Sequence, residues 1–283
     1  MRTQFALVAV ALALAAGVAC AGVTFEIGYD FDAGSQSLTR MSATIDGVEM
    51  GNDVPLAVSG AAAVDLTLEV LEVDDDGVAT IRATFGEVEA RLMEEAQEAG
   101  TPDPVDLRLD RRGALVGVTS ADAPEIDLFA SGGVPLQLVV LLAGAVQMRA
   151  EPVGLGESWT IEGCQQVPQV GEITMHVTSQ ITEVTTDEIV VVTDIQASLP
   201  DFTTANPMGD EEVTVQNGVL TIEGMRRTVD MKTGLIKSAA AEMRFDGFAA
   251  FGPFPPLPLG VTSTFGIAPA EAEVADPQEQ VDG

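Results

Sequence analysis

The sequence VDLTLEVLEV, residues 64–73, alternates apolar and polar side chains along most of its length. A period of two is typical of a β-strand that buries one of its faces. The turn-forming residues Asp74-Asp75-Asp76-Gly77 follow, and β-branched residues resume from Val78 to Phe85. We therefore predict a β-hairpin over residues 64–85.

The same layout returns in the second half of the chain. Ile173 to Val184 and Ile189 to Ile195 have strand patterns, and Thr185 to Glu188 separates them as a turn. Two further stretches, LRLDRRGALV at 107–116 and TVDMKTGLIK at 228–237, share one order of residues: a strand that ends in Asp, a basic turn with Gly, and a new apolar strand. This similarity indicates two related β-rich halves, either through duplication or because β-hairpins of this kind are common.

An apolar segment separates the two halves. Residues Leu128 to Met148 carry no charge, and Pro135 suits the first turn of a helix over Val134 to Met148. Such a helix, about 22 Å long at 1.5 Å per residue, is shorter than the hydrocarbon core of a membrane. We expect it to lie buried against a concave sheet or across an opening. A second, amphipathic helix is predicted over Glu87 to Ala99, with an extension of the preceding strand as the alternative for its first residues.

These patterns predict a fold that is mainly β with a few helices. It is an α+β fold of two related, antiparallel, curved sheets, half-barrel-like in shape and joined by the apolar helix. The predicted organisation is a signal peptide at 1–21, an N-terminal β-rich half at 22–150, a C-terminal β-rich half at 151–267 and an acidic, disordered tail at 268–283. The last strand is expected at Val261 to Ile267.

The N-terminus has the pattern of an export signal. Arg2 provides a positive charge, Phe5 to Ala16 is apolar, and Ala19-Cys20-Ala21 suits cleavage after residue 21. As an alternative, Gly17-Val18-Ala19-Cys20 resembles a bacterial lipobox, in which Cys20 is lipidated and anchors the chain. We therefore expect an exported protein of the periplasm, the cell surface or the medium.

The charge balance argues against two classes of partner. The chain has 13 Lys and Arg against 44 Asp and Glu, a formal net charge of −31. Affinity for nucleic acid or for an anionic membrane surface comes mainly from cations that neutralise phosphates, so we expect neither partner. A hydrophobic fraction of 46% still provides enough apolar side chains for a packed core. The acidic surface also suggests adaptation to high salt, where self-repulsion is screened.

The residues of common catalytic sites are scarce in this chain. The only histidine, His176, falls on the polar face of its predicted strand, and no nucleophile elbow or nucleotide-binding fingerprint occurs. With Cys20 in the export signal, Cys164 is left unpaired and is expected to be buried. We therefore predict no catalytic residue, no metal site and no cofactor. The acidic segments at 74–77 and 209–212 are predicted to be solvated turns, with weak calcium binding as the alternative, and Trp159 is predicted to lie in the core.

Aromatic residues near the C-terminus recur every three positions. The series is Phe245, Phe248, Phe251, Phe254 and Leu257, and it leads into a Pro-rich stretch at 252–258. A period of three matches a polyproline II helix. The segment is predicted to be a connector packed on the core or, alternatively, the wall of a ligand cavity.

Two motifs carry a resemblance to known families. Leu155-Gly156-Glu157-Ser158-Trp159 and the segment from Asp230 to Ile236, together with twin antiparallel sheets, resemble secreted bacterial proteins of unknown function. More distantly, the pattern is similar to the half-barrel family of periplasmic lipoprotein carriers and mycobacterial lipid-binding lipoproteins. This resemblance implies an antiparallel sheet that curls around an apolar cavity closed by helices.

The expected function is therefore that of an exported, non-enzymatic binding protein that encloses a hydrophobic ligand, such as a lipid or an acyl chain. The candidate cavity or lid residues are Leu136, Leu138, Val140, Leu141, Leu142, Phe251 and Phe254. The main alternative is a structural or protein-interaction module of the cell envelope, with an envelope protein as partner. A carboxylate-dependent hydrolase is a more distant alternative, because 44 acidic residues provide many candidate pairs.

Overall fold

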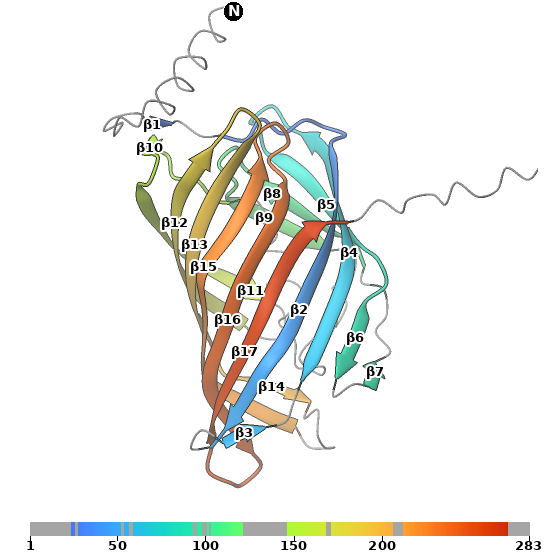
Figure 1. Cartoon of the computed structure of the whole chain (residues 1–283), viewed down its shortest axis with the longest axis vertical. Helices are drawn as coiled ribbons and strands as arrows, with labels where there is room; N and C mark the ends of the chain where they lie inside the picture. Colours follow the sequence, from blue (N-terminus) through green and yellow to red (C-terminus); the bar gives the residue numbers. More distant parts are fainter. Residues whose placement is uncertain are drawn as a thin grey trace, which may run out of the picture.

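The computed structural model describes residues 24–25, 28–51, 54–56, 59–92, 95–97, 101, 103–120, 146–167, 171–205 and 212–270. Over these residues the secondary structure consists of β-strands, which form one sheet of 15 strands and one of 2 (Figure 1). The strands are β1 (Thr24–Phe25), β2 (Gln36–Met50), β3 (Val54–Leu56), β4 (Gly60–Val73), β5 (Ala79–Phe85), β6 (Glu89–Leu92), β7 (Glu95–Gln97), β8 (Val105–Leu109), β9 (Leu115–Ser120), β10 (Val153–Gly154), β11 (Ser158–Val167), β12 (Gly171–Val184), β13 (Glu188–Leu199), β14 (Phe202–Ala205), β15 (Glu212–Asp230), β16 (Ile236–Phe251) and β17 (Leu257–Pro269).

The large sheet runs without a break from the C-terminal half of the chain into the N-terminal half. Its order is β11-β12-β13-β15-β16-β17-β2-β4-β5-β8-β9. The two halves meet where β17 pairs antiparallel with β2, from Leu259 opposite Met50 to Pro269 opposite Thr39. The prediction of two separate sheets joined by a helix is therefore wrong. The free edges of β17 and β2 satisfy each other's backbone hydrogen bonds, which two isolated sheets would leave exposed.

The predicted helices are also corrected by the structure. The segment Glu87–Ala99 was expected to be helical, but it contains β6 and β7, and β6 pairs with β4 from Gly60 opposite Leu92. Pairing to an existing sheet edge overrides the local helical pattern. Most of the predicted apolar helix lies outside the described residues, and its last part, Val146 to Met148, is not helical. The described part of the chain is thus all-β rather than α+β, and none of it forms a helix that could span a membrane.

In three of the predicted hairpins, the turn that joins the two strands has the same hydrogen-bonding arrangement. The turns begin at Asp74, Asp110 and Asp230, after β4, β8 and β15. Each Asp carboxylate accepts a hydrogen bond from the backbone amide two residues later, at 2.8 or 3.0 Å. A glycine at positive φ completes each turn: Gly77, Gly113 and Gly234. These three hairpins and the fourth, β12–β13, are confirmed.

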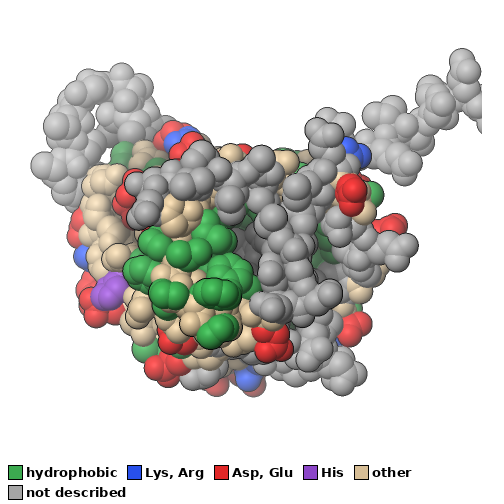
Figure 2. Space-filling view, turned by 90° about the horizontal axis from the view of Figure 1, so that it is seen from below, with side chains coloured by type: hydrophobic (Ala, Val, Ile, Leu, Met, Phe, Trp, Pro, Cys, Tyr) green, Lys and Arg blue, Asp and Glu red, His purple; other side chains and the backbone are tan. Residues whose placement is uncertain are grey.

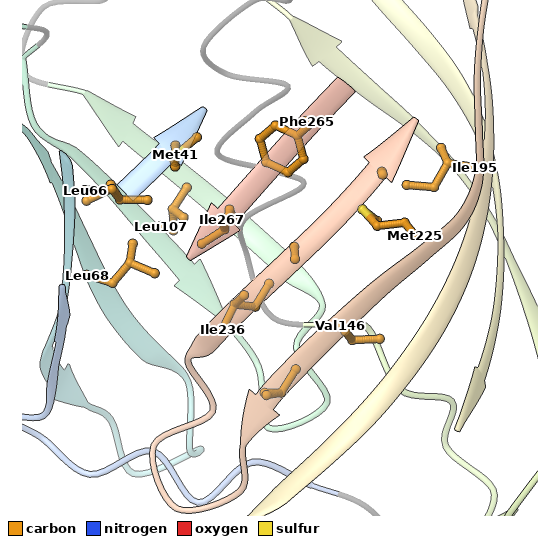
Figure 3. Packing of buried hydrophobic residues seen from close by; sticks show 14 of the residues in the cluster. Met41, Leu66, Leu68, Leu107, Val146, Ile195, Met225, Ile236, Phe265 and Ile267 are labelled. Carbon is orange, nitrogen blue, oxygen red and sulfur yellow. The ribbon is translucent and has the colours of Figure 1, made fainter. Parts of the chain in front are cut away.

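One face of the large sheet is apolar and lines the interior of the molecule. On β13, Val191, Thr193, Ile195 and Ala197 are buried and alternate with more exposed residues, so alternate side chains point inward. The curvature brings the inward rows of different strands toward one another (Figure 3). The inward side chains labelled there are Met41, Leu66, Leu68, Leu107, Ile195, Met225, Ile236, Phe265 and Ile267 on strands, with Val146 beside them.

The C-terminal aromatic series forms a β-hairpin rather than a polyproline II helix. Phe245, Phe248 and Phe251 lie on β16, and Leu257 begins β17. The backbone turns between them, where Gly252 has a φ of 51°. Pairing of β16 with β17 therefore prevails over the period of three. The expected last strand is confirmed as β17.

Candidate functional site

The interior face of the sheet carries one charged residue among its buried side chains. Arg227 lies on β15 between Met225 and Val229, which are both fully buried. Its own exposed fraction is 5%, and it is the only buried charged residue in the described part of the chain. The preceding residue, Arg226, faces outward and pairs with Glu183 at 2.8 Å. The alternation of the strand thus places two neighbouring arginines in opposite environments.

The guanidinium of Arg227 is only partly satisfied by the described residues. Its Nη2 donates a hydrogen bond of 2.8 Å to Thr193 Oγ1 on β13. Its Nε is buried and has no hydrogen-bond partner within the described part of the chain. None of the ion pairs among the described residues includes Arg227. A buried cation without a counterion is costly, because desolvation is not repaid by an ion pair.

Two buried hydroxyls continue the polar cluster. Thr193 and Ser179 share a hydrogen bond of 3.1 Å between their hydroxyl oxygens, and both side chains are buried. Because Thr193 also accepts from Arg227, the cluster links β15, β13 and β12 in one row. We refer to Arg227, Thr193 and Ser179 as the interior polar cluster. Its lateral neighbours are apolar: Val191 and Ala239 lie opposite Arg227 on the adjoining strands.

Burial shifts the pKa values of two interior groups, Arg227 and Tyr29, in the directions that favour their neutral forms. It lowers the pKa of Arg227 to about 10, and the interaction with Tyr29 opposes this only in part. It raises the pKa of the Tyr29 phenol well above its usual value, against the opposing effects of the Arg227 charge and of a hydrogen bond to Val146. The Tyr29 hydroxyl donates that bond to the Val146 carbonyl at 2.8 Å. Arg227 therefore remains protonated at neutral pH and supplies one positive charge to the interior.

The carboxylates with shifted pKa values lie elsewhere and stay ionised. A hydrogen bond from Lys232, at 2.7 Å, lowers the pKa of Asp187. Partial burial raises the pKa of Asp230, but hydrogen bonds from Lys237 and from the backbone amides of Lys232 and Thr233 outweigh it, so the net shift is downward. A carboxyl that acts as a general acid needs the opposite shift.

The outward face of the β11–β12 pair holds the residues that sequence patterns had singled out for their chemistry. His176 is exposed, as predicted, with its Nδ1 3.3 Å from Glu162 Oε1. Cys164 was expected to be buried but is exposed. It lies on β11, at one edge of the large sheet, and its side chain faces outward beside Thr174. Trp159, on the same strand, lies in the core with an exposed fraction of 5%, as predicted. Its Nε1 donates a hydrogen bond of 3.1 Å to the Gln147 carbonyl.

Apolar side chains are also exposed at the end of the molecule that carries the β16–β17 loop. Phe254, in that loop, has an exposed fraction of 70%. Phe248 on β16 and Leu257 on β17 are 41% and 42% exposed. Figure 2 views this end and shows hydrophobic side chains gathered on it. We call these three residues the loop patch.

A separate groove of about 580 Å³ crosses β15, β16, β17 and β2. Most of its lining side chains are small, such as Ala240 and Ser42, and its ionisable groups are Glu223 and Glu242. Arg227 does not line it. Two carboxylates make this groove a poor site for an anionic ligand.

The sequence-predicted cavity residues do not join the interior polar cluster. Phe251, partly buried at the end of β16, lies opposite Val213 on β15, whereas Ala239 of β16 lies opposite Arg227. Twelve residues of strand separate the two positions, about 40 Å at 3.3 Å per residue. Phe254 belongs to the loop patch. The other predicted site residues lie outside the described residues: Cys20, Leu136, Leu138, Val140, Leu141 and Leu142.

Sequence patterns missed Arg227, although one pattern pointed to it. It shares the parity of Met225 and Val229, so simple alternation places it on their face. The adjacent Arg226 makes this parity difficult to recognise, because two consecutive arginines suggest a solvent-exposed stretch. The irregular pairing of β15 with β16 between Glu223 and Arg226 also breaks the count from the earlier part of the strand.

The comparisons with known proteins identify no family. No protein-family model matches the chain. No curated protein matches it. Among solved structures, the chain is similar to one described as lipid–protein interactions in lipovitellin, at 12% sequence identity and a TM-score of 0.44. That likeness covers 88% of this chain but 27% of the other, so this chain spans about a quarter of that structure's length.

Proposed function

We propose that the protein is an exported, non-enzymatic binding protein that holds a hydrophobic ligand, a lipid or an acyl chain, against the inner face of its curved sheet. The observation that carries this proposal is the continuous apolar inner face, to which β2, β4, β8, β13, β15, β16 and β17 all contribute buried side chains (Figure 3). Burial of apolar surface is the driving force, at about 0.8 kcal/mol for each methylene group removed from water. Affinity should therefore increase with the length of the acyl chain.

Native mass spectrometry of the protein purified from its own cells tests the proposal most directly. We expect an added mass that solvent extraction releases as a lipid or another apolar molecule. Delipidated protein should then bind saturated fatty acids of 8, 12 and 16 carbons with affinities that rise by about tenfold for each added pair of methylene groups. A clean protein mass together with no measurable binding of any of the three acids would refute the proposal.

A matched pair of substitutions on β16 tests whether the ligand lies on the inner face. Ala241 is buried and Ala240, its neighbour, is exposed. Ala241→Phe adds bulk to the interior and should weaken binding of the 16-carbon acid, whereas Ala240→Phe adds the same bulk outside and should not. Equal effects of the two substitutions on the dissociation constant would place the ligand elsewhere. The unfolding transition of each variant shows whether it remains folded.

The export part of the proposal rests on the N-terminal sequence alone. Residues 1–23 lie outside the described residues. The intact mass of the secreted protein should correspond to a chain that starts at Gly22 or at an acylated Cys20. A mass that retains Met1 would contradict export by either route.

The loop patch supports a second candidate, a structural or protein-interaction module of the cell envelope. Three large apolar side chains exposed within one hairpin, at positions 248, 254 and 257, are typical of a contact surface for another protein. Under this alternative, the native mass spectrum would show a bound envelope protein instead of a small molecule. Phe254→Asp should then abolish that complex and leave fatty-acid binding unchanged.

A further inference from the structure

We propose that Arg227 binds the carboxylate of a fatty acid whose acyl chain lies on the apolar inner face of the sheet. This inference rests on the proposed function and specifies its ligand. It assigns the polar head of the ligand to one fixed position on the inner face, so the site would select an acid over a neutral molecule of the same length.

The first argument is the count of hydrogen-bond donors in the interior polar cluster. The Arg227 Nε–H is buried and has no acceptor among the described residues. Thr193 and Ser179 together carry two hydroxyl protons, and their shared hydrogen bond uses one of them. Thr193 accepts from Arg227, so that contact uses neither proton. The cluster therefore offers a carboxylate a guanidinium N–H and one hydroxyl, which are groups that an anionic oxygen accepts strongly.

The second argument is charge. Arg227 is the only buried charged residue in the described part of the chain, so the interior supplies a single positive charge. One cation matches a monoanion such as a carboxylate, whereas a phosphate dianion would remain unneutralised in a medium of low polarity. The phenol of Tyr29 does not serve as the counterion, because it donates its proton to the Val146 carbonyl.

The third argument is the apolar surface around the cluster. Met225 and Val229 flank Arg227 along β15, and Val191 and Ala239 flank it on the neighbouring strands. All four side chains are buried and apolar. A ligand whose head contacts Arg227 would therefore lay its hydrocarbon chain directly on apolar rows. A polar small molecule would have no partners there beyond the cluster itself.

The test compares dodecanoic acid with methyl dodecanoate, which has the same chain but no charge. Binding of each to the delipidated full-length protein is measured by calorimetry at pH 8. We expect the wild type to bind the acid at least about tenfold more tightly than the ester, as charge-assisted hydrogen bonds imply. Arg227→Met should lose this preference and still bind the ester. Arg226→Gln, a matched change on the outward face of the same strand, should keep the preference.

The outcomes separate this inference from the proposed function. Equal affinity of the wild type for acid and ester overturns the role of Arg227 and leaves hydrophobic binding intact. No binding of either molecule overturns both. If Arg227→Met fails to fold, as judged by Trp159 emission and circular dichroism, Arg227→Lys provides the second variant. It keeps the charge but loses the forked donor geometry, so it should retain a reduced preference for the acid. An undiminished preference for the acid in a folded Arg227→Met variant, or in Arg227→Lys, would contradict the inference.

Discussion

At the scale of single residues, Tyr29 and Arg227 show two outcomes for a polar group in an apolar interior. The Tyr29 hydroxyl has the partner it needs, the Val146 carbonyl at 2.8 Å. Among the described residues, Arg227 has one hydrogen-bond partner, Thr193, and its buried Nε has none. A satisfied buried group contributes to stability, while an unsatisfied donor costs free energy. This difference is why Tyr29 is assigned to the fold and Arg227 to a ligand.

Alkaline titration of Tyr29 gives a prediction at this scale. Tyr29 is the only tyrosine in the chain, so tyrosinate absorbance near 295 nm reports it alone. Burial raises its pKa in the folded protein above the unfolded value of about 10. The phenol should therefore stay protonated in the native protein between about pH 10 and 11, and ionise at once when denaturant is added.

The same pKa shift of Tyr29 makes the free energy of unfolding depend on pH. A pKa that is higher in the folded state contributes stability below the unfolded pKa, and this contribution is lost as the pH rises above it. Tyr29 should therefore make the free energy of unfolding fall above about pH 10, while the lowered pKa of Arg227 acts in the opposite direction. Because Tyr29→Phe removes only the first contribution, the stability of this variant relative to the wild type should rise above about pH 10. A native protein that titrates with an ordinary tyrosine curve would show that the phenol is not buried.

At the scale of elements, the hairpin turns combine two local devices. An Asp side chain accepts a backbone amide two residues later, and a glycine at positive φ reverses the chain, as in the turn from Asp230 to Gly234. Both devices are local in sequence, which explains why these hairpins were predictable. The turn after β15 also packs against the N-terminal segment, where a Cβ on Gly234 would lie 2.5 Å from a ring carbon of Phe31.

Two glycine substitutions separate backbone strain from this packing. Gly234 and Gly156 have similar positive φ values, 71° and 80°, but a Cβ on Gly156 would meet nothing within 4 Å. Gly156→Ala should lower the free energy of unfolding by about 1 kcal/mol through strain alone. Gly234→Ala should cost more, by a further 1–3 kcal/mol or so, because Phe31 must move. Chemical denaturation measures both, and equal losses would show that Phe31 yields without cost.

At the scale of the whole molecule, the large sheet must remain folded despite a large negative charge. The formal net charge is −31, and the described ion pairs lie mostly at the surface, as for Arg40 with Asp65 at 42% and 51% exposure. Exposed pairs of this kind contribute little. Stability therefore depends on the buried inner face and on the strand pairs, among them β17 with β2, which joins the two halves of the large sheet.

The salt dependence of the free energy of unfolding tests whether the surface charge destabilises the fold. Screening weakens the self-repulsion of the acidic surface, so the free energy of unfolding should rise by about 1 kcal/mol or more between 0.05 and 1 M NaCl. Urea denaturation is the suitable measurement, because urea adds no ions. Equal stabilities at both salt concentrations would contradict a destabilising role for the surface charge and, with it, the hypothesis of adaptation to a saline habitat.

The sequence by itself determined the strands and the turns of the hairpins, because alternation and turn residues act within about ten residues of chain. It also determined the outward placement of His176 and the burial of Trp159. It failed over Glu87 to Ala99, where pairing of β6 with β4 replaced a helical pattern. A local sequence pattern does not indicate which edge of a sheet is available for pairing.

Only the tertiary structure decided that one large sheet spans both halves of the chain and that Arg227 lies on its inner face. The junction of β17 with β2 pairs Pro269 with Thr39, far apart in the sequence, and depends on two edges with unsatisfied backbone groups. The environment of Arg227 depends likewise on Thr193 and Ser179, which come from two other strands. Such contacts form only when the sheet curves and brings its inward rows together, and no segment of the sequence contains that information alone.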